Sequence, residues 1–181
     1  MVQDIQSIAP LVTELRGLGY EVGDKLGCGM RGCTWALADG LVVKLTSDTK
    51  EACLAVYQAR VQFEALPAIR FVIATKHSGR SLFAIIREDA KDLVVDDRRR
   101  FNLMLMRKDP PSQWRLSEHD AGLQSRARSS LEQLKASGLS CADLNQANLG
   151  RVEDRVVLRD LGSISRLDSD IFAEISKDSL P

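Results

Sequence analysis

The chain has 181 residues, of which 44% are hydrophobic and 28% are charged. This composition supports a packed core and gives no reason to expect a disordered chain, and the length suits one ordinary domain or two small lobes. Lysine and arginine together number 25, as do aspartate and glutamate. This balance gives no reason to expect a nucleic-acid partner.

The first residues and the cysteines indicate a cytoplasmic protein. Residues 1–10 lack the basic start and apolar core of a signal peptide, and no apolar stretch is long enough to span a membrane. The four cysteines form no CxxC pair and have no histidine at metal-ligand spacing. We therefore expect four reduced thiols, at Cys28, Cys33, Cys53 and Cys141.

The first half of the chain predicts a β-rich lobe over residues 1–88. Apolar residues at helical spacing from Ile5 to Leu15 predict a short helix, and a β-rich segment then predicts strands at about 20–26, 33–38 and 41–46. The Asp39-Gly40 pair predicts a hairpin turn.

A helix is expected next, beginning with the polar residues from Thr46 to Glu51 and running to about Ala65. Two further strands are expected at about 69–75 and 81–87, around a turn at Ser78 to Arg80.

The second half, residues 89–181, predicts a smaller and mostly helical lobe. The apolar segment from Phe101 to Met106 is too short to separate helix from strand. Apolar residues from Leu123 to Leu134 predict a helix that ends near Ser137 and Gly138. The short apolar pieces beyond it suggest no particular element. The expected fold class is therefore α+β.

A glycine motif of the form GxGxxG comprises Gly27, Gly29 and Gly32. Alone it fits a dinucleotide-binding turn, three unrelated turn glycines, or a lid over nucleotide phosphates. A strand pattern and a hairpin follow it, where a dinucleotide-binding turn would require a helix. This context favours the lid, in which backbone N–H groups lie over the phosphates.

Lys44 lies within an apolar β-forming run. A buried lysine needs a partner for its charge. Either it points outward from an edge strand, or it reaches nucleotide phosphates while an acid holds it. Glu51 is the nearest candidate for that acid, and Glu64 is the second.

Three polar residues near the end of the chain complete a set suited to phosphoryl transfer. Asp143 could accept the proton of an attacking hydroxyl group. Asn148 and Asp160 offer the hard oxygen ligands that magnesium prefers. Gly162 follows Asp160 and lets the backbone turn sharply there.

In this order, the motifs resemble those of the protein-kinase-like superfamily, which includes protein kinases and small-molecule kinases such as the aminoglycoside phosphotransferases. The resembling segments are residues 26–32 for the glycine-rich loop, 42–44 for the strand lysine, 141–148 for the catalytic loop and 160–162 for the DFG motif.

The resemblance implies a bilobal kinase fold that binds ATP and Mg²⁺, with Asp143 and Lys44 catalytic and Glu51 paired with the lysine. It also implies a hinge from Ile86 to Asp89 that contacts adenine, including Ile86 and Glu88.

The chain departs from the family pattern in several places. Cys141 and Ala142 replace the usual His and Arg, so a switch by activation-loop phosphorylation is not expected. Glu51 follows Lys44 by only seven residues. No APE motif is present and 19 residues follow Gly162, so we expect a minimal, truncated C-lobe. Such compact kinase-like proteins would suit a phage or mobile-element origin.

The expected function is ATP- and Mg²⁺-dependent phosphate transfer, as in a serine/threonine-type protein kinase. The acceptor would be a protein hydroxyl, including Ser163, Ser165 or Ser169 of this chain, or a small molecule. One alternative is a pseudokinase-like module that binds nucleotide or a partner without turnover. Homodimerisation or a partner would then cover apolar surface of the truncated lobe. The other alternative is an unrelated α+β domain with accidental motifs.

Overall fold

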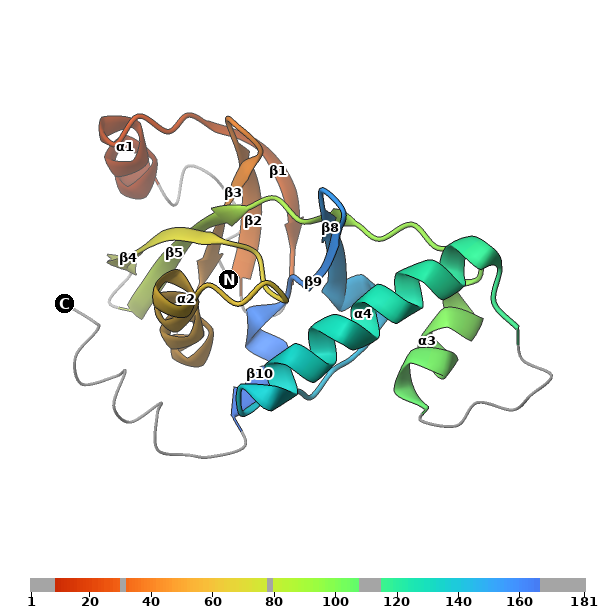
Figure 1. Ribbon diagram of the computed structural model, residues 1–181. Helices are drawn as coiled ribbons and strands as arrows, with labels where there is room; N and C mark the ends of the chain where they lie inside the picture. Colours follow the sequence, from red (N-terminus) through yellow and green to blue (C-terminus); the bar gives the residue numbers. More distant parts are fainter. Residues whose placement is uncertain (1–8, 30–31, 78–79, 108–114, 167–181) are drawn as a thin grey trace. The chain divides into compact units, whose positions relative to one another are not determined.

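The computed structural model describes residues 9–29, 32–77, 80–107 and 115–166. Its secondary structure is α+β, as the sequence predicts (Figure 1). The chain divides into two compact units. Among the described residues, the first unit comprises 9–62 and 68–89, and the second comprises 63–67 and 90–166.

The first unit is built on a five-stranded antiparallel sheet with strand order β1-β2-β3-β5-β4. The strands are β1 (Val22–Cys28), β2 (Gly32–Leu37), β3 (Leu41–Thr46), β4 (Ile69–His77) and β5 (Arg80–Glu88). All five predicted strands are therefore present, while residues 78 and 79 of the predicted turn lie outside the described residues. The Asp-Gly turn is confirmed, because Asp39 and Gly40 have φ angles of 58° and 68°.

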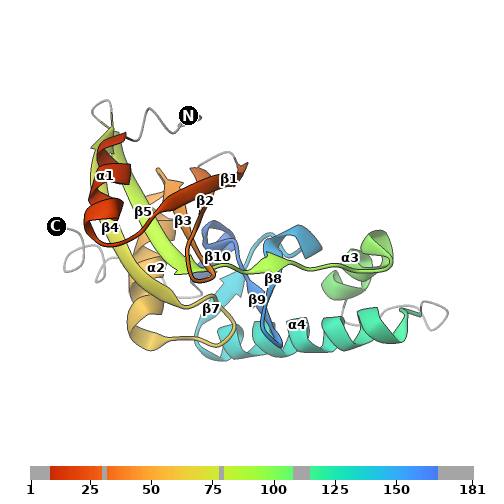
Figure 2. The ribbon, with the colours of Figure 1, turned by 90° about the horizontal axis from the view of Figure 1, so that it is seen from above.

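Helices α1 (Ala9–Gly17) and α2 (Thr49–Val61) lie on opposite faces of this sheet (Figures 1 and 2). The α1 face is apolar, and its buried cluster includes Leu11, Leu15, Trp35, Val43 and Leu45. Since side chains alternate along a strand, Lys44 must lie on the other face, toward α2. Residues 5–8 of the predicted first helix lie outside the described residues.

Helix α2 begins where the sequence predicts and ends earlier. The carboxylate of Asp48 caps it by accepting hydrogen bonds from the backbone N–H groups of Lys50 and Glu51, at 3.0 and 3.4 Å. The predicted extension to Ala65 is wrong. Gln62 adopts a left-handed conformation with a φ of 58°, and this ends the helix after Val61.

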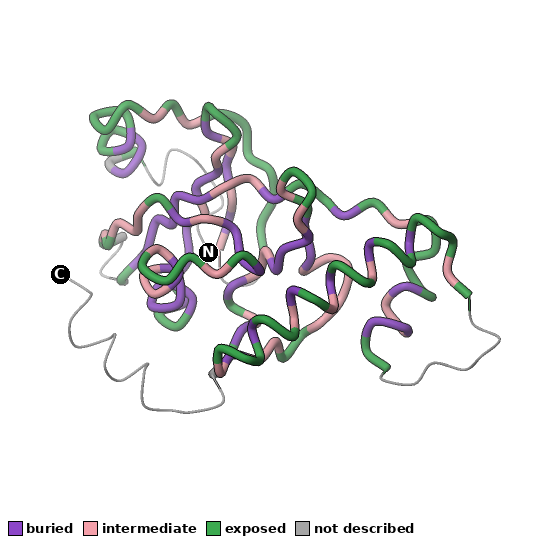
Figure 3. Tube along the Cα trace, in the orientation of Figure 1, coloured by how far each residue is buried: buried purple, intermediate pink, exposed green. Residues whose placement is uncertain are grey.

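The second unit contains helices α3 (Arg98–Met106) and α4 (Glu118–Ala136). The segment that the sequence left undecided is thus helical, and Asp97 caps it by accepting a hydrogen bond from the Arg100 N–H at 2.9 Å. Helix α4 ends near the predicted position, with Ser137 as its C-terminal cap and Gly138 following it at a φ of 74°. Buried and exposed residues alternate along it, as an amphipathic helix requires (Figure 3).

Two small sheets accompany these helices, so the second unit is less helical than expected. One joins β6 (Lys91–Asp92), β8 (Leu149–Val152) and β9 (Arg155–Leu158). The other pairs β7 (Leu139–Cys141) with β10 (Ile164–Arg166). These short strands carry too little periodicity to be predicted from sequence.

Candidate functional site

An ion pair joins the central strand of the first unit to α2. The Nζ atom of Lys44 lies 2.5 Å from Oε1 of Glu51, and their side chains are 17% and 2% exposed. Strand β3 has a neighbour on each side, so the edge-strand alternative for Lys44 is wrong. Glu64, the second candidate, is exposed and belongs to the other unit.

The glycine motif lies between two antiparallel strands, β1 and β2. A dinucleotide-binding turn is thereby excluded, because no helix follows the glycines. Within the hairpin, the Gly29 N–H donates a hydrogen bond to the Gly32 carbonyl at 2.8 Å. Met30 and Arg31, at its centre, lie outside the described residues.

The three glycines of the motif have different surroundings. A Cβ atom on Gly32 would lie 2.0 Å from the carbonyl oxygen of Leu45, which belongs to the neighbouring strand. Among the described residues other than the chain neighbours, nothing lies within 4 Å of a Cβ atom built on Gly27 or Gly29. Gly32 is therefore required by the sheet, whereas Gly27 and Gly29 leave open space beside the backbone.

The expectation of four reduced thiols is wrong for two of them. Cys28 and Cys33 form a disulfide, while Cys53 and Cys141 are free. The physical reason is register, since Cys28 and Cys33 lie directly opposite each other on β1 and β2, with their Cα atoms 4.0 Å apart.

In the second unit, Asn148 is bound to Asp143. Its Nδ2 atom donates hydrogen bonds to the Asp143 carbonyl at 2.8 Å and to Oδ2 at 3.0 Å. The Asp143 Oδ1 atom accepts a hydrogen bond from Asn145 at 2.9 Å. These contacts fix the Asn148 amide through its nitrogen and leave its oxygen unused by the described residues.

Pairing of β7 with β10 brings Asp160 to the same end of a sheet as Asp143. Cys141 is the last residue of β7 and lies opposite Ile164, the first residue of β10. The segment that leaves β7 and the segment that enters β10 therefore meet at one end of this pair. Asp160 is half-buried there and precedes the 3-10 helix η3 (Leu161–Ser163).

The pKa of the Cys141 thiol is affected by the charged groups in this region. Burial raises the pKa of its thiol, and the negative charges of Asp143 and Asp160 raise it further. A hydrogen bond with Ser163, at 3.4 Å between Sγ and Oγ, and one with the Asp143 backbone oppose these effects. Both carboxylates thus act on a single thiol.

Sequence reasoning missed two residues that hold this region together. Asn145 binds Asp143, and its own oxygen also accepts a hydrogen bond from the Ala147 N–H at 2.9 Å. Arg159 donates to the Ala147 carbonyl at 2.9 Å and forms an ion pair with Asp92. Asn145 lies two residues after Asp143, and Arg159 directly precedes Asp160. This closeness in sequence to predicted site residues was the only signal that could have identified them.

The expected hinge residues lie within or at the end of the sheet. Ile86 is 0% exposed in the cluster that packs on α1, and its strand is paired on both sides. It is thus part of the core, and its side chain is not available to a ligand. Glu88 ends β5, and its Oε2 atom accepts a hydrogen bond from the Ala68 N–H at 2.9 Å.

A second acidic group lies at the start of α4, where Asp96, His119 and Asp120 place possible ligand atoms within 4.8 Å of one another. Sequence reasoning did not find it. Both carboxylate oxygens of the buried Asp120 accept backbone hydrogen bonds, from Asp96 at 2.9 Å and Asp97 at 3.1 Å. Asp120 therefore has a structural role in holding the chain that precedes α3.

No family model matches the chain, and no curated protein matches it. Among the residues that the structure describes, no helix has the length and apolar character to cross a membrane. Residue chemistry and local geometry therefore carry the functional assignment.

Proposed function

We propose that the chain is an ATP- and Mg²⁺-dependent phosphotransferase of the protein-kinase-like kind. The observation that carries this proposal is the ion pair between Lys44 and Glu51. A lysine in a central strand needs a buried acid to hold its charge, and a nucleotide site needs that lysine fixed in place. The glycine hairpin ends on β2, which pairs with the strand of Lys44 in the same sheet.

Residues of the first unit would bind the nucleotide. Lys44 would contact the α- and β-phosphates while Glu51 orients its ammonium group. The backbone around Gly27 and Gly29 has open space for close approach to phosphate oxygens. Strand β5 ends at Glu88, so the chain that follows it would serve as the hinge.

Residues of the second unit would perform the chemistry. Asp143 would accept the proton of the attacking hydroxyl, with its carboxylate oriented by Asn145 and Asn148. The oxygen of Asn148 and the carboxylate of Asp160 fit magnesium, which prefers such hard ligands. When bound, the ion would neutralise charge on the phosphates.

The two units would correspond to the two lobes of a kinase-like fold. A protein hydroxyl is the proposed acceptor, and Ser163 and Ser165 are candidates within the described chain. Ser169 lies outside the described residues. A small-molecule hydroxyl is the alternative acceptor, which the same polar groups would serve.

A binding module without turnover is the second candidate. Both carboxylate oxygens of Asp143 already accept hydrogen bonds from the side-chain amides of Asn145 and Asn148, so the carboxylate is engaged within its own loop. In that case the chain would hold nucleotide and contact a partner, and the same groups would bind without transferring phosphate.

One experiment separates the two candidates. The purified chain is incubated under reducing conditions with γ-labelled ATP, Mg²⁺ and a panel of protein and small-molecule acceptors, beside an Asp160→Ala variant. An enzyme gives labelled product that the variant does not give. Thermal stabilisation by MgATP without product would support the binding module. If MgATP gave no thermal stabilisation and no labelled product were formed, both candidates would be overturned.

A further inference from the structure

The glycine hairpin between β1 and β2 is closed on itself in two ways. The disulfide between Cys28 and Cys33 links the two strands directly beside the glycine turn. Inside that link, the Gly29 N–H donates its hydrogen bond to the Gly32 carbonyl at 2.8 Å. A donor that could point outward at a phosphate is thus used within the hairpin.

The disulfide lies on the opposite face of the sheet from Lys44. Cys33 belongs to the apolar cluster that packs on α1, together with Trp35 and Val43. Lys44 is paired in register with Thr34 and faces α2. Reducing the disulfide would therefore free the backbone of the hairpin without removing any side chain proposed to contact nucleotide.

The hairpin has room to change conformation once the link is opened. Apart from its chain neighbours, no described residue places an atom within 4 Å of a Cβ position on Gly27 or Gly29. Glycine also has the widest choice of backbone conformations. Cys28 is exposed, so a small reductant can reach this end of the bond, whereas Cys33 is 1% exposed.

We propose that the Cys28–Cys33 pair is a redox switch of the nucleotide site, in which the dithiol form binds MgATP more tightly than the disulfide form. The switch rests on the proposed function. It assigns a regulatory role to the glycine motif in addition to phosphate contact. In a reducing compartment the open, dithiol form would prevail, and protein disulfides there are commonly transient and regulatory.

The switch operates by thiol–disulfide exchange with a low-molecular-weight dithiol. One thiolate of the reductant attacks the sulfur of Cys28, the protein disulfide breaks, and the sulfur of Cys33 leaves and takes up a proton. The second thiolate of the reductant attacks the mixed disulfide and releases Cys28. The reductant loses two electrons as its own disulfide forms, and the protein gains them. A small-molecule disulfide drives the reverse exchange.

The test uses the full chain, oxidised or reduced with dithiothreitol, with its thiols counted by alkylation and mass spectrometry. Calorimetric titration measures the dissociation constant for MgATP, and amide hydrogen exchange measures protection of residues 22–37. Reduction should lower the dissociation constant at least tenfold and speed exchange in the hairpin. Cys28→Ser should match the reduced protein under both conditions. Cys53→Ala, which removes a buried thiol elsewhere, should respond as the wild type does.

Each outcome decides between distinct claims. Equal affinities in the two redox states would overturn the switch and leave the proposed function standing, as would tighter binding by the disulfide form. Absence of MgATP binding in both states would overturn the proposed function, and the switch would fall with it. Redox-sensitive affinity in Cys28→Ser would also overturn the switch, because that variant lacks the disulfide.

Discussion

Lys44 and Glu51 are bound to each other across the interface between the sheet and α2, with 2.5 Å between Nζ and Oε1. Glu51 follows Lys44 by only seven positions in the chain, and the short connection includes Asp48, which caps α2. The cap starts the helix so early that Glu51 falls in its first turn, against β3. The short connection therefore lets Lys44 pair with Glu51, whereas the sequence alone did not decide between Glu51 and Glu64.

Lys44→Met should destabilise the first unit. The carboxylate of Glu51 is 2% exposed and would lose its cation, which costs about 3 kcal/mol of unfolding free energy. The double variant Lys44→Met/Glu51→Leu should recover much of that loss, because it leaves no unpaired buried charge. Urea denaturation followed by circular dichroism measures both.

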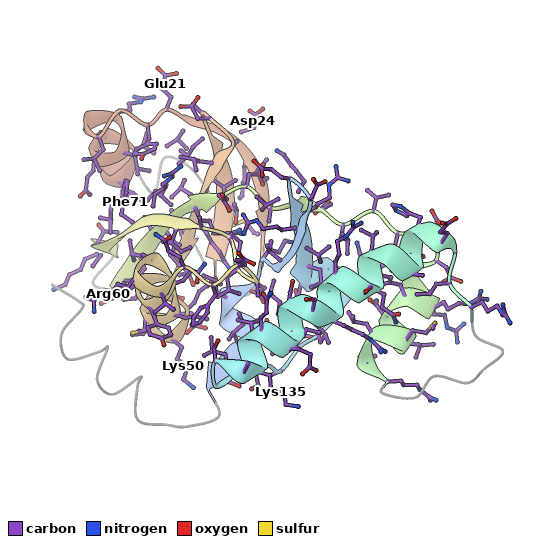
Figure 4. The ribbon with its side chains drawn as sticks, viewed as in Figure 1. Glu21, Asp24, Lys50, Arg60, Phe71 and Lys135 are labelled. Atoms are coloured by element: carbon purple, nitrogen blue, oxygen red, sulfur yellow. A yellow bond between two sulfur atoms is a disulfide. The ribbon has the colours of Figure 1, made fainter. Side chains whose placement is uncertain are left out.

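The control for this pair is Lys50→Met. Lys50 is exposed on the same helix turn as Glu51 and is labelled in Figure 4. Its substitution should change the free energy of unfolding by less than about 0.5 kcal/mol. If the loss of stability in Lys44→Met/Glu51→Leu equalled the sum of the losses in the single variants Lys44→Met and Glu51→Leu, the ion pair would have no energetic role.

Substituting alanine for each glycine of the motif should distinguish the glycine that the fold requires from those that nucleotide binding requires. Gly32→Ala places a methyl group against the Leu45 carbonyl, and we expect a loss of about 3 kcal/mol in stability. Gly27→Ala and Gly29→Ala should leave stability within about 1 kcal/mol of wild type. If the backbone approaches phosphate, these two variants should nevertheless bind MgATP more weakly. Thermal melts and calorimetry measure the two effects, and unchanged affinity in both would remove the hairpin from the site.

Asn148→Ala should impair phosphate transfer far more than folding. It removes one proposed metal ligand, and we expect transfer to fall by about 100-fold or more. The lost hydrogen bonds to Asp143 should cost only about 1 kcal/mol. Lys135→Ala, an exposed change at the end of α4 (Figure 4), is the matched control. Raising the Mg²⁺ concentration should partly restore the rate of Asn148→Ala, and an unaltered rate in the variant would exclude a ligand role.

Asp160→Asn should make Cys141 react faster with iodoacetamide at pH 8. The carboxylate of Asp160 is one of the charges that raise the pKa of Cys141, and a raised pKa lowers the thiolate fraction at a given pH. Removing the charge lowers the pKa and increases that fraction. Asp154→Asn, at an exposed position between β8 and β9, should leave the rate unchanged. A rate unaffected by Asp160→Asn would contradict the closeness of Asp160 to Cys141.

Local signals explain why much of the first unit could be predicted. The Asp39-Gly40 turn, the Asp48 cap and the alternating β-strands all depend on residues close together in sequence. The end of α2 could not be predicted, because it depends on Gln62 adopting a left-handed conformation. Glycine or asparagine usually marks such an end, and glutamine gives no comparable signal.

Long-range register explains what the sequence did not reveal. The Cys28–Cys33 link depends on how β1 pairs with β2, and an irregularity in β1 makes that pairing hard to infer. The pairing of Cys141 with Ile164 likewise joins three-residue strands that are far apart in the chain. Asp143 and Asn148 were recognisable by residue type, but the support from Asn145 was visible only in the hydrogen bonds.

The most direct test of the central claim is the initial rate of phosphate transfer from MgATP by the reduced chain, compared with Lys44→Met and Asp160→Asn. The two variants alter different units of the protein. We predict transfer above background for the wild type and a rate at least 100-fold lower for each variant, with both variants still folded. No transfer by the wild type to any acceptor, or equal transfer by all three proteins, would contradict the proposed phosphotransferase.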